Sequence, residues 1–111
     1  MARKKRETVR KEIRESLLMQ LRGKGAFTPF YFDLVEKYMD LWDDVEVMRE
    51  DIRDRGMRYE ATSASGKVYE KPNENLDRIP RHLKEMESLL DRMKLSPDSV
   101  ILEDGQDDDA L

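Results

Sequence analysis

Apolar residues recur at helical spacing near the start of the chain. In residues 3–22 an apolar side chain stands at every fourth position with no proline or glycine between them, which predicts an amphipathic helix. These positions are Val9, Ile13, Leu17 and Leu21. Gly23 and Gly25 follow, and glycine commonly ends a helix because it adopts the left-handed conformation without strain.

A second, longer helix is predicted from Pro29 to Arg55. Thr28 suits the N-cap, Pro29 suits the first helical position, and Gly56 supplies the stop. At roughly 1.5 Å per residue the helix would be about 40 Å long, so it needs other helices along its length. Its apolar residues alternate spacings of three and four residues, as in a heptad repeat, and two further residues widen this apolar stripe. We expect this stripe to form the subunit contacts of an oligomer: Tyr31, Leu34, Val35, Tyr38, Leu41, Trp42, Val45, Met48 and Ile52.

Residues 57–72 change character. Met57, Tyr59, Val68 and Tyr69 flank a turn that contains serine and glycine, so we predict a short β-hairpin or an ordered loop there. A two-stranded hairpin is marginally stable alone in water, so this one would have to pack against the helices.

Helical spacing returns after residue 75 and predicts a third amphipathic helix. Pro80 lies inside it, so the helix either kinks there or starts near the proline, because proline lacks a backbone donor and clashes with the preceding turn. The apolar seam consists of Leu76, Ile79, Leu83, Met86, Leu90 and Met93, with Leu89 beside it.

These elements predict a mainly α fold, a long antiparallel helical hairpin that oligomerises through its helix seams. We divide the chain into a basic N-terminal helix over residues 1–25 and a helical oligomerisation core over residues 26–99. The β-hairpin or loop is an insertion in that core at residues 57–72. Residues 100–111 are acidic and poor in apolar side chains, so we expect them to form a disordered tail.

The net charge of −4 hides two ends of opposite sign. The first fourteen residues hold seven basic and two acidic side chains, whereas the segment from residue 103 onward holds five acids and no base. Lysines and arginines on one helix neutralise phosphates and release counterions, so the basic end predicts DNA or RNA binding, with a solvated terminus as the plain alternative. The candidate contacts are Arg3, Lys4, Lys5, Arg6, Arg10, Lys11 and Arg14.

The residues needed for catalysis are missing. One histidine and no cysteine leave catalytic triads and most transition-metal sites without their parts. The nearest approach to a phosphate-binding loop has Ala61 in place of the first glycine and Val68 in place of the hydroxyl residue. The acids of the second helix have arginines at i, i+4 spacing and suit a solvated face better than a metal site. We therefore expect no enzyme activity, cofactor or metal and, without a long apolar run, no membrane segment.

The stretch from Lys71 to Leu76 leads into the third helix, which ends at Leu95, Ser96 and Pro97. This first stretch resembles phage terminase small subunits, a family that typically shows Lys-Pro-Asn-Pro, a helix and Leu-Gly-Leu-Thr-Pro, and a second stretch does so as well. Lys94 stands where the family commonly has glycine. The second stretch is the basic start with the apolar stripe of the second helix. The residues of the first stretch are Lys71, Pro72, Asn73, Glu74, Asn75 and Leu76.

The resemblance implies a ring-forming homo-oligomer in the host cytoplasm. It implies binding to double-stranded viral DNA, and recruitment of the terminase large subunit, which carries the ATPase and nuclease, by the C-terminal end. DNA contact through the basic N-terminus is inferred from charge. Two other interpretations stay open: a small phage or prophage helix-turn-helix DNA-binding regulator, and a helical structural adaptor that needs no DNA.

Overall fold

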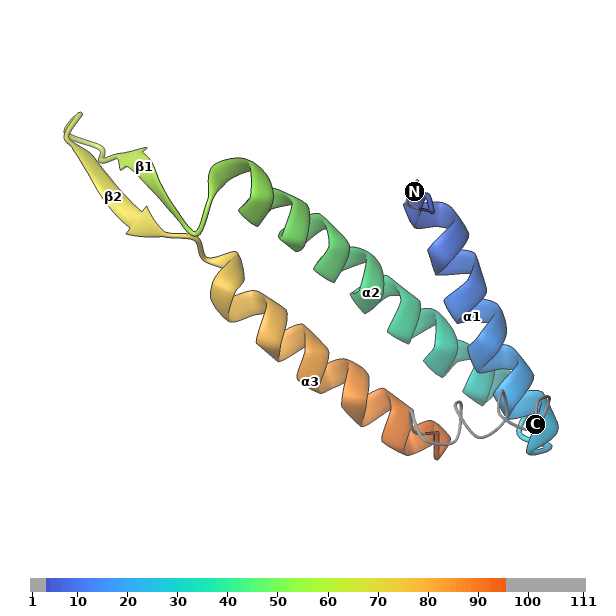
Figure 1. Ribbon diagram of the computed structural model, residues 1–111. Helices are drawn as coiled ribbons and strands as arrows, with labels where there is room; N and C mark the ends of the chain where they lie inside the picture. Colours follow the sequence, from blue (N-terminus) through green and yellow to red (C-terminus); the bar gives the residue numbers. More distant parts are fainter. Residues whose placement is uncertain (1–3, 96–111) are drawn as a thin grey trace, which may run out of the picture. The chain divides into compact units, whose positions relative to one another are not determined.

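The computed structural model describes residues 4–95, which form three helices and a two-stranded antiparallel sheet (Figure 1). The mainly α fold with a short β-hairpin is confirmed. Arg3 and the acidic tail at residues 100–111 lie outside the described residues. The elements are α1 (Arg6–Gly23), α2 (Pro29–Arg55), β1 (Arg58–Thr62), β2 (Val68–Pro72) and α3 (Asn75–Met93).

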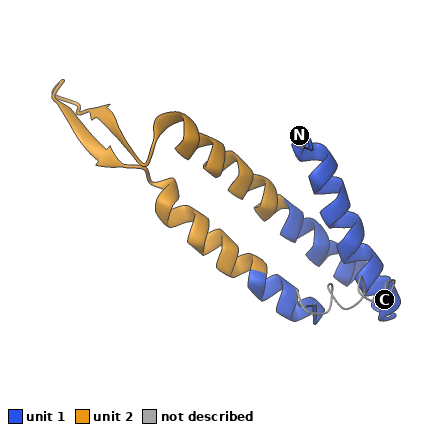
Figure 2. Ribbon diagram, viewed as in Figure 1, with its two compact units in different colours: residues 1–39, 87–111 blue, residues 40–86 orange. Residues whose placement is uncertain are grey.

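The chain divides into two compact units (Figure 2). The described part of the first unit consists of residues 4–39 and 87–95, which supply α1, the first part of α2 and the last turns of α3. Lys24 links two of these segments, since its Nζ donates to the carbonyl of Met93 at 3.3 Å and to that of Lys94. The buried apolar side chains of this unit are Leu17, Leu21, Leu34, Val35, Met39, Leu89, Met93 and Leu95.

The last turn of α3 ends in a backbone conformation that favours glycine. Lys94 has φ +58°, in the left-handed region that glycine adopts most easily. The backbone N–H of Leu95 donates to the carbonyl of Leu90 at 2.9 Å, as in a Schellman motif, and the Leu95 side chain is buried. The backbone turn is therefore formed with a lysine at the position where the pattern that the sequence resembles has glycine.

The second unit consists of residues 40–86, which hold the end of α2, the hairpin and the start of α3. Gly56 ends α2 with φ +91°, and its N–H donates to the carbonyl of Ile52 at 2.8 Å. A Cβ at this glycine would lie 3.3 Å from the Arg58 carbonyl oxygen. The strands pair in register from Arg58 opposite Pro72 to Thr62 opposite Val68, within the segment where the hairpin is predicted.

The third helix begins before Pro80, which excludes the alternative in which it starts near the proline. α3 starts at Asn75 and includes Pro80, so it does not begin at the proline. Pro80 is the sixth helical residue, where its missing N–H removes only a donor to Leu76. The predicted apolar seam is split in the structure: Met86 and Met93 are buried, whereas Leu76 and Leu83 are each 39% exposed.

Candidate functional site

The basic side chains at the start of the chain differ in exposure. Lys4, Lys5, Arg6 and Lys11 are exposed on the first turns of α1 or just before them. Arg10 and Arg14, which belong to the same set of predicted DNA contacts, are only partly exposed. Because successive residues are about 100° apart on a helix, Arg10 lies between the buried Leu17 and Leu21 in helical projection. Arg10 and Arg14 therefore lie on the side of α1 that packs in the first unit, whereas the lysines lie on its other sides.

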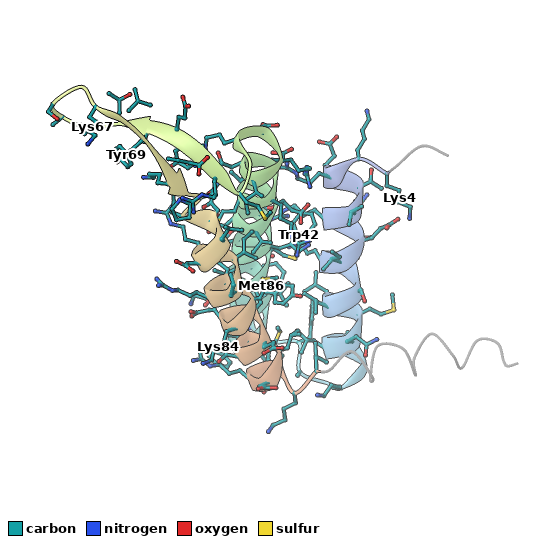
Figure 3. All side chains as sticks on the ribbon, turned by 60° about the vertical axis from the view of Figure 1, so that its left-hand side comes forward. Lys4, Trp42, Lys67, Tyr69, Lys84 and Met86 are labelled. Carbon is teal, nitrogen blue, oxygen red and sulfur yellow. The ribbon has the colours of Figure 1, made fainter. Side chains whose placement is uncertain are left out.

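Carboxylates already hold two of these cations. Lys4 Nζ lies 3.0 Å from Glu12 Oε2, and Arg14 Nε lies 2.7 Å from Glu36 Oε2 on α2. The Arg14 guanidinium also lies 5.3 Å from the centroid of the Phe32 ring. Figure 3 shows Lys4 at the start of α1. Arg14 thus helps to hold α1 against α2, whereas Lys5 and Lys11 pair with no carboxylate among residues 4–95.

The apolar stripe of α2 belongs largely to the interior of the protomer. Four of its nine members, Leu34, Val35, Val45 and Met48, are buried, and Val35 is 0% exposed. Burial raises the pKa of the Tyr38 phenol through loss of solvation. The remaining five are half-buried and keep part of their surface exposed: Tyr31, Tyr38, Leu41, Trp42 and Ile52.

A polar cluster missed by the sequence analysis lies at the base of the hairpin. Asn73 is 2% exposed and donates from Nδ2 to Asp51 Oδ2 at 2.9 Å and to the Gly56 carbonyl at 3.1 Å. Its Oδ1 accepts the N–H of Asn75 at 2.9 Å, which caps the start of α3. Asn75 in turn donates to Asp51 Oδ2 at 2.8 Å. The cluster ties the end of α2 to the start of α3.

Arg55 lies beside this cluster and contacts two carboxylates and one aromatic ring. It makes two hydrogen bonds to the Asp51 carboxylate at 2.7 Å each, lies 3.5 Å from Glu74 Oε2, and places its guanidinium 3.9 Å from the Tyr59 ring centroid. The Tyr59 hydroxyl donates to Glu74 Oε1 at 2.7 Å. Hydrogen bonds from Arg55 and Asn73 lower the pKa of Asp51 to about 2. Hydrogen bonds from the Glu74 backbone and from Tyr59 lower the pKa of Glu74 to about 2.

These two carboxylates predict a loss of stability in acid. Both pKa values lie below their ordinary values of 3.8 and 4.5, so the stabilisation is complete above about pH 4.5 and disappears as pH falls towards 2. Thermal unfolding between pH 7 and pH 2.5 should show a smaller fall in Tm for Asp51→Asn than for the wild type. Asp54→Asn, an exposed change on the same helix, should follow the wild-type profile. Parallel profiles for the wild type and Asp51→Asn would refute the role given to Asp51.

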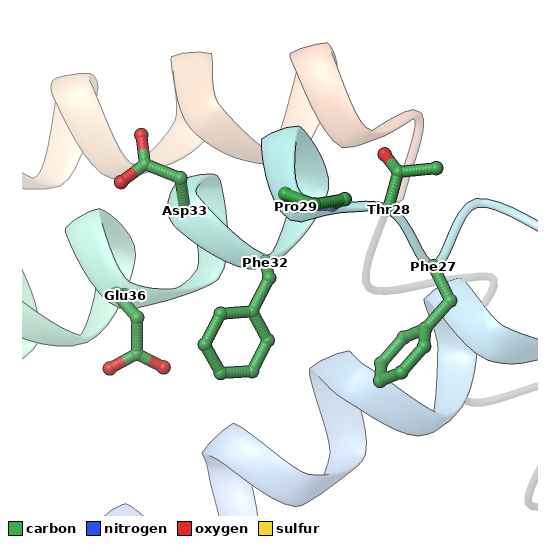
Figure 4. Close-up of a pocket in the computed structure, with 6 residues that line it drawn as sticks. All are labelled: Phe27, Thr28, Pro29, Phe32, Asp33 and Glu36. Atoms are coloured by element: carbon green, nitrogen blue, oxygen red, sulfur yellow. The ribbon is translucent and has the colours of Figure 1, made fainter.

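An open groove of about 660 Å³ lies in the first unit (Figure 4). Its walls are two aromatic rings, Phe27 and Phe32, and Arg22 lies 4.8 Å from the Phe27 ring centroid. No spacing in the sequence indicates this groove, because Phe27 precedes α2 and belongs to no periodic pattern. The lining residues are Phe27, Thr28, Pro29, Phe32, Asp33 and Glu36.

Within residues 4–95, no group of three or more histidine, cysteine, aspartate or glutamate side chains is placed to hold a metal ion. His82 Nδ1 lies at hydrogen-bond distance, 3.1 Å, from the Arg78 carbonyl oxygen, which is the acceptor, and His82 Nε2 lies 3.4 Å from Asp44 Oδ2. In the same described part of the chain, no helix is long and apolar enough to cross a membrane.

Comparison with known families shows to which family the chain belongs. A family model described as phage terminase, small subunit, matches residues 11–100. The chain belongs to this family. No curated protein and no solved structure matches the chain. For this terminase small subunit, family membership supports a role in phage DNA packaging, and the match includes both the α2 stripe and the Asn73 cluster.

Proposed function

We propose that this terminase small subunit binds double-stranded viral DNA through the start of α1, assembles with itself into a ring in the host cytoplasm, and recruits the large subunit. The ATPase and nuclease reactions belong to that partner. The family match supports the packaging role, and the exposed lysines beside the α1 N-terminus carry the DNA-binding part of the proposal.

The start of α1 combines two sources of positive potential. Lys5 and Lys11 are exposed and pair with no carboxylate in the described part of the chain. The helix begins at Arg6, and no side chain caps its first turn, so its unsatisfied N–H groups add a partial positive charge. Phosphate oxygens accept hydrogen bonds from both kinds of group. Arg14 would have to leave Glu36 to reach a phosphate, so we give it the smallest share of the contacts.

Self-assembly belongs to the same proposal. The half-buried side chains of the α2 stripe, such as Tyr31, Leu41 and Trp42, have surface left for a neighbouring copy. The buried members, such as Val35, already pack inside the protomer and contribute by fixing the shape of α2.

The DNA-binding part predicts a change in the salt dependence of affinity. Lys5→Ala combined with Lys11→Ala should weaken binding to DNA of any sequence and lower the slope of log K against log salt by about 2, since each phosphate contact contributes about one unit. The measurement is a titration of labelled duplex DNA at four salt concentrations.

The control removes two cations from another surface. Arg49→Ala combined with Arg53→Ala changes the net charge equally, and both arginines are exposed on the acidic part of α2. This control should leave the slope unchanged. Equal slopes for all three proteins would contradict DNA contact by α1 and favour a structural adaptor that needs no DNA.

A further inference from the structure

All three phenylalanines of the chain are exposed at one place in the first unit. Phe27, Phe30 and Phe32 lie just before α2 or in its first turn, and their exposed fractions are 48%, 63% and 40%. Phe27 and Phe32 form walls of the open groove in this unit. Phenyl rings are usually buried in a core, so their collection beside a groove indicates a binding surface.

Each of the two wall rings lies against a guanidinium from α1. Arg22 lies 4.8 Å from the Phe27 ring centroid, and Arg14 lies 5.3 Å from the Phe32 ring centroid. Figure 4 shows both rings on the same side of the chain, pointing towards α1. Since both rings keep exposed surface, the groove offers aromatic faces and positive charge side by side. Single-stranded nucleic acids bind to this combination, because bases stack on aromatic rings and phosphates pair with cations.

The charges around the groove favour an anionic ligand. Glu36 points the same way as the rings but pairs with Arg14 at 2.7 Å, and Asp33 pairs with Lys37 at 2.6 Å. Arg22, by contrast, pairs with no carboxylate among residues 4–95. Once the other charges are paired, the guanidinium of Arg22 is left for a ligand, and it attracts a phosphate.

The groove also continues the flank of α1 that carries a proposed DNA contact. Lys11 and Arg22 are both exposed and eleven residues apart, which places them about 20° apart around α1 and about 16 Å apart along it. Glu15 is the acid that lies between them on this flank. At about 3.4 Å per stacked nucleotide, a strand that leaves a duplex near Lys11 reaches Arg22 and the two rings within about five nucleotides.

We propose that the Phe27–Phe32 groove binds unpaired nucleotides of single-stranded DNA, with bases stacked on the two rings and a phosphate paired with Arg22. This inference rests on the proposed binding of duplex DNA by the start of α1 and adds a second kind of DNA substrate. The duplex contacts Lys5 and Lys11, and an unpaired end continues along α1 into the groove. The subunit thereby distinguishes an unpaired end of DNA from continuous duplex.

Comparison of blunt and overhanging DNA tests the groove. The probes are a fluorescently labelled blunt duplex and the same duplex with a single-stranded thymidine overhang at the 3′ or the 5′ end. Titration with the full-length protein, followed by fluorescence anisotropy, measures each affinity. The wild type should bind one of the overhanging duplexes about tenfold more tightly than the blunt one, because each stacked base adds to the affinity.

Substitution of the two rings should remove this preference. Phe27→Ala combined with Phe32→Ala should bind all probes with the wild-type affinity for the blunt duplex, because Lys5 and Lys11 are unchanged. Phe27→Leu combined with Phe32→Leu should show the same loss, since leucine keeps apolar surface but offers no ring to a base. The matched control is Phe30→Ala, which removes an exposed ring that does not line the groove and should keep the preference. Circular dichroism shows whether each variant keeps its helices.

Two charge variants test the path of the strand. Arg22→Ala should weaken binding to the overhanging duplex and lower its slope of log K against log salt by about 0.7, the contribution of one phosphate on a single strand. The slope for the blunt duplex should stay unchanged. Glu15→Gln should strengthen binding to the overhanging duplex, because it removes the acid between Lys11 and Arg22.

The outcomes separate this inference from the proposed function. Equal affinity of the wild type for blunt and overhanging DNA would overturn the groove assignment and leave duplex binding standing. Failure to bind any of the probes would overturn both. A preference retained by either double variant would show that the rings do not stack with bases. A double alanine variant that keeps the preference but no longer binds the purified large subunit would assign the groove to a protein partner instead.

Discussion

Asn73→Ala should destabilise the protein by about 2–4 kcal/mol. The substitution removes the cap of α3, which is worth about 1 kcal/mol, and the two hydrogen bonds that the Asn73 amide donates, which are worth about 0.5–1.5 kcal/mol each. The acceptors of these two bonds are the Asp51 carboxylate and the Gly56 carbonyl. Urea unfolding at pH 7, followed by circular dichroism, measures the change in the free energy of unfolding.

Asn73→Asp separates the two roles of this side chain. An aspartate keeps an oxygen that accepts the N–H of Asn75, so the cap survives, but it cannot donate to Asp51 and adds a second carboxylate beside it. It should therefore be at least as destabilising as Asn73→Ala at pH 7 and recover part of the loss in acid. A small loss for both variants, within about 0.5 kcal/mol, would show that the cluster does not hold the second unit together.

The elements with local signals could be predicted from the sequence. The predicted bounds of α2 agree with the structure because Pro29 and Gly56 act on the backbone beside them, without help from distant residues. The turn residues between the two strands likewise placed the hairpin within residues 57–72. Signals of this kind depend on the φ preferences of glycine and proline and on the backbone N–H that proline lacks, and both follow from the residue type alone.

The polar cluster could not be predicted, because its partners are far apart in the chain. The pattern indicated a solvated Asp51 with an arginine nearby, and the Arg55 pair at i, i+4 is present. The amides that also bind Asp51 come from Asn73 and Asn75, more than twenty residues away. Only tertiary structure brings them together, and Asn73 was noticed solely as part of a family pattern.

Periodicity also identifies an apolar face without saying what covers it. Val35 and Leu83 both lie on predicted seams, yet one is fully buried and the other is 39% exposed. The same limit applies to charge: the cluster of basic residues predicted that Arg14 contacts phosphate, and in the structure Arg14 pairs with Glu36. Which cations remain available to DNA depends on how α1 packs, and the helical wheel alone leaves that open.

The packing of α1 itself predicts the second large effect. Leu21→Ala should lower the free energy of unfolding by about 2–5 kcal/mol, since Leu21 is 0% exposed and its loss leaves a cavity in the core of the first unit. Met19→Ala, two residues earlier on the same helix, removes a side chain that is 67% exposed and should change stability by less than about 0.5 kcal/mol. Urea unfolding at pH 7 compares the two variants.

The same pair of variants separates the packing of α1 from its proposed contact with DNA. At a temperature where Leu21→Ala is still folded, its DNA affinity should keep the wild-type salt slope, because Lys5 and Lys11 lie off the buried face and are unchanged. Similar unfolding free energies for Leu21→Ala and Met19→Ala would show that α1 does not pack as described. Its arginines would then be as accessible to phosphate as its lysines, and the salt slope should be tested with Arg10 and Arg14 replaced as well.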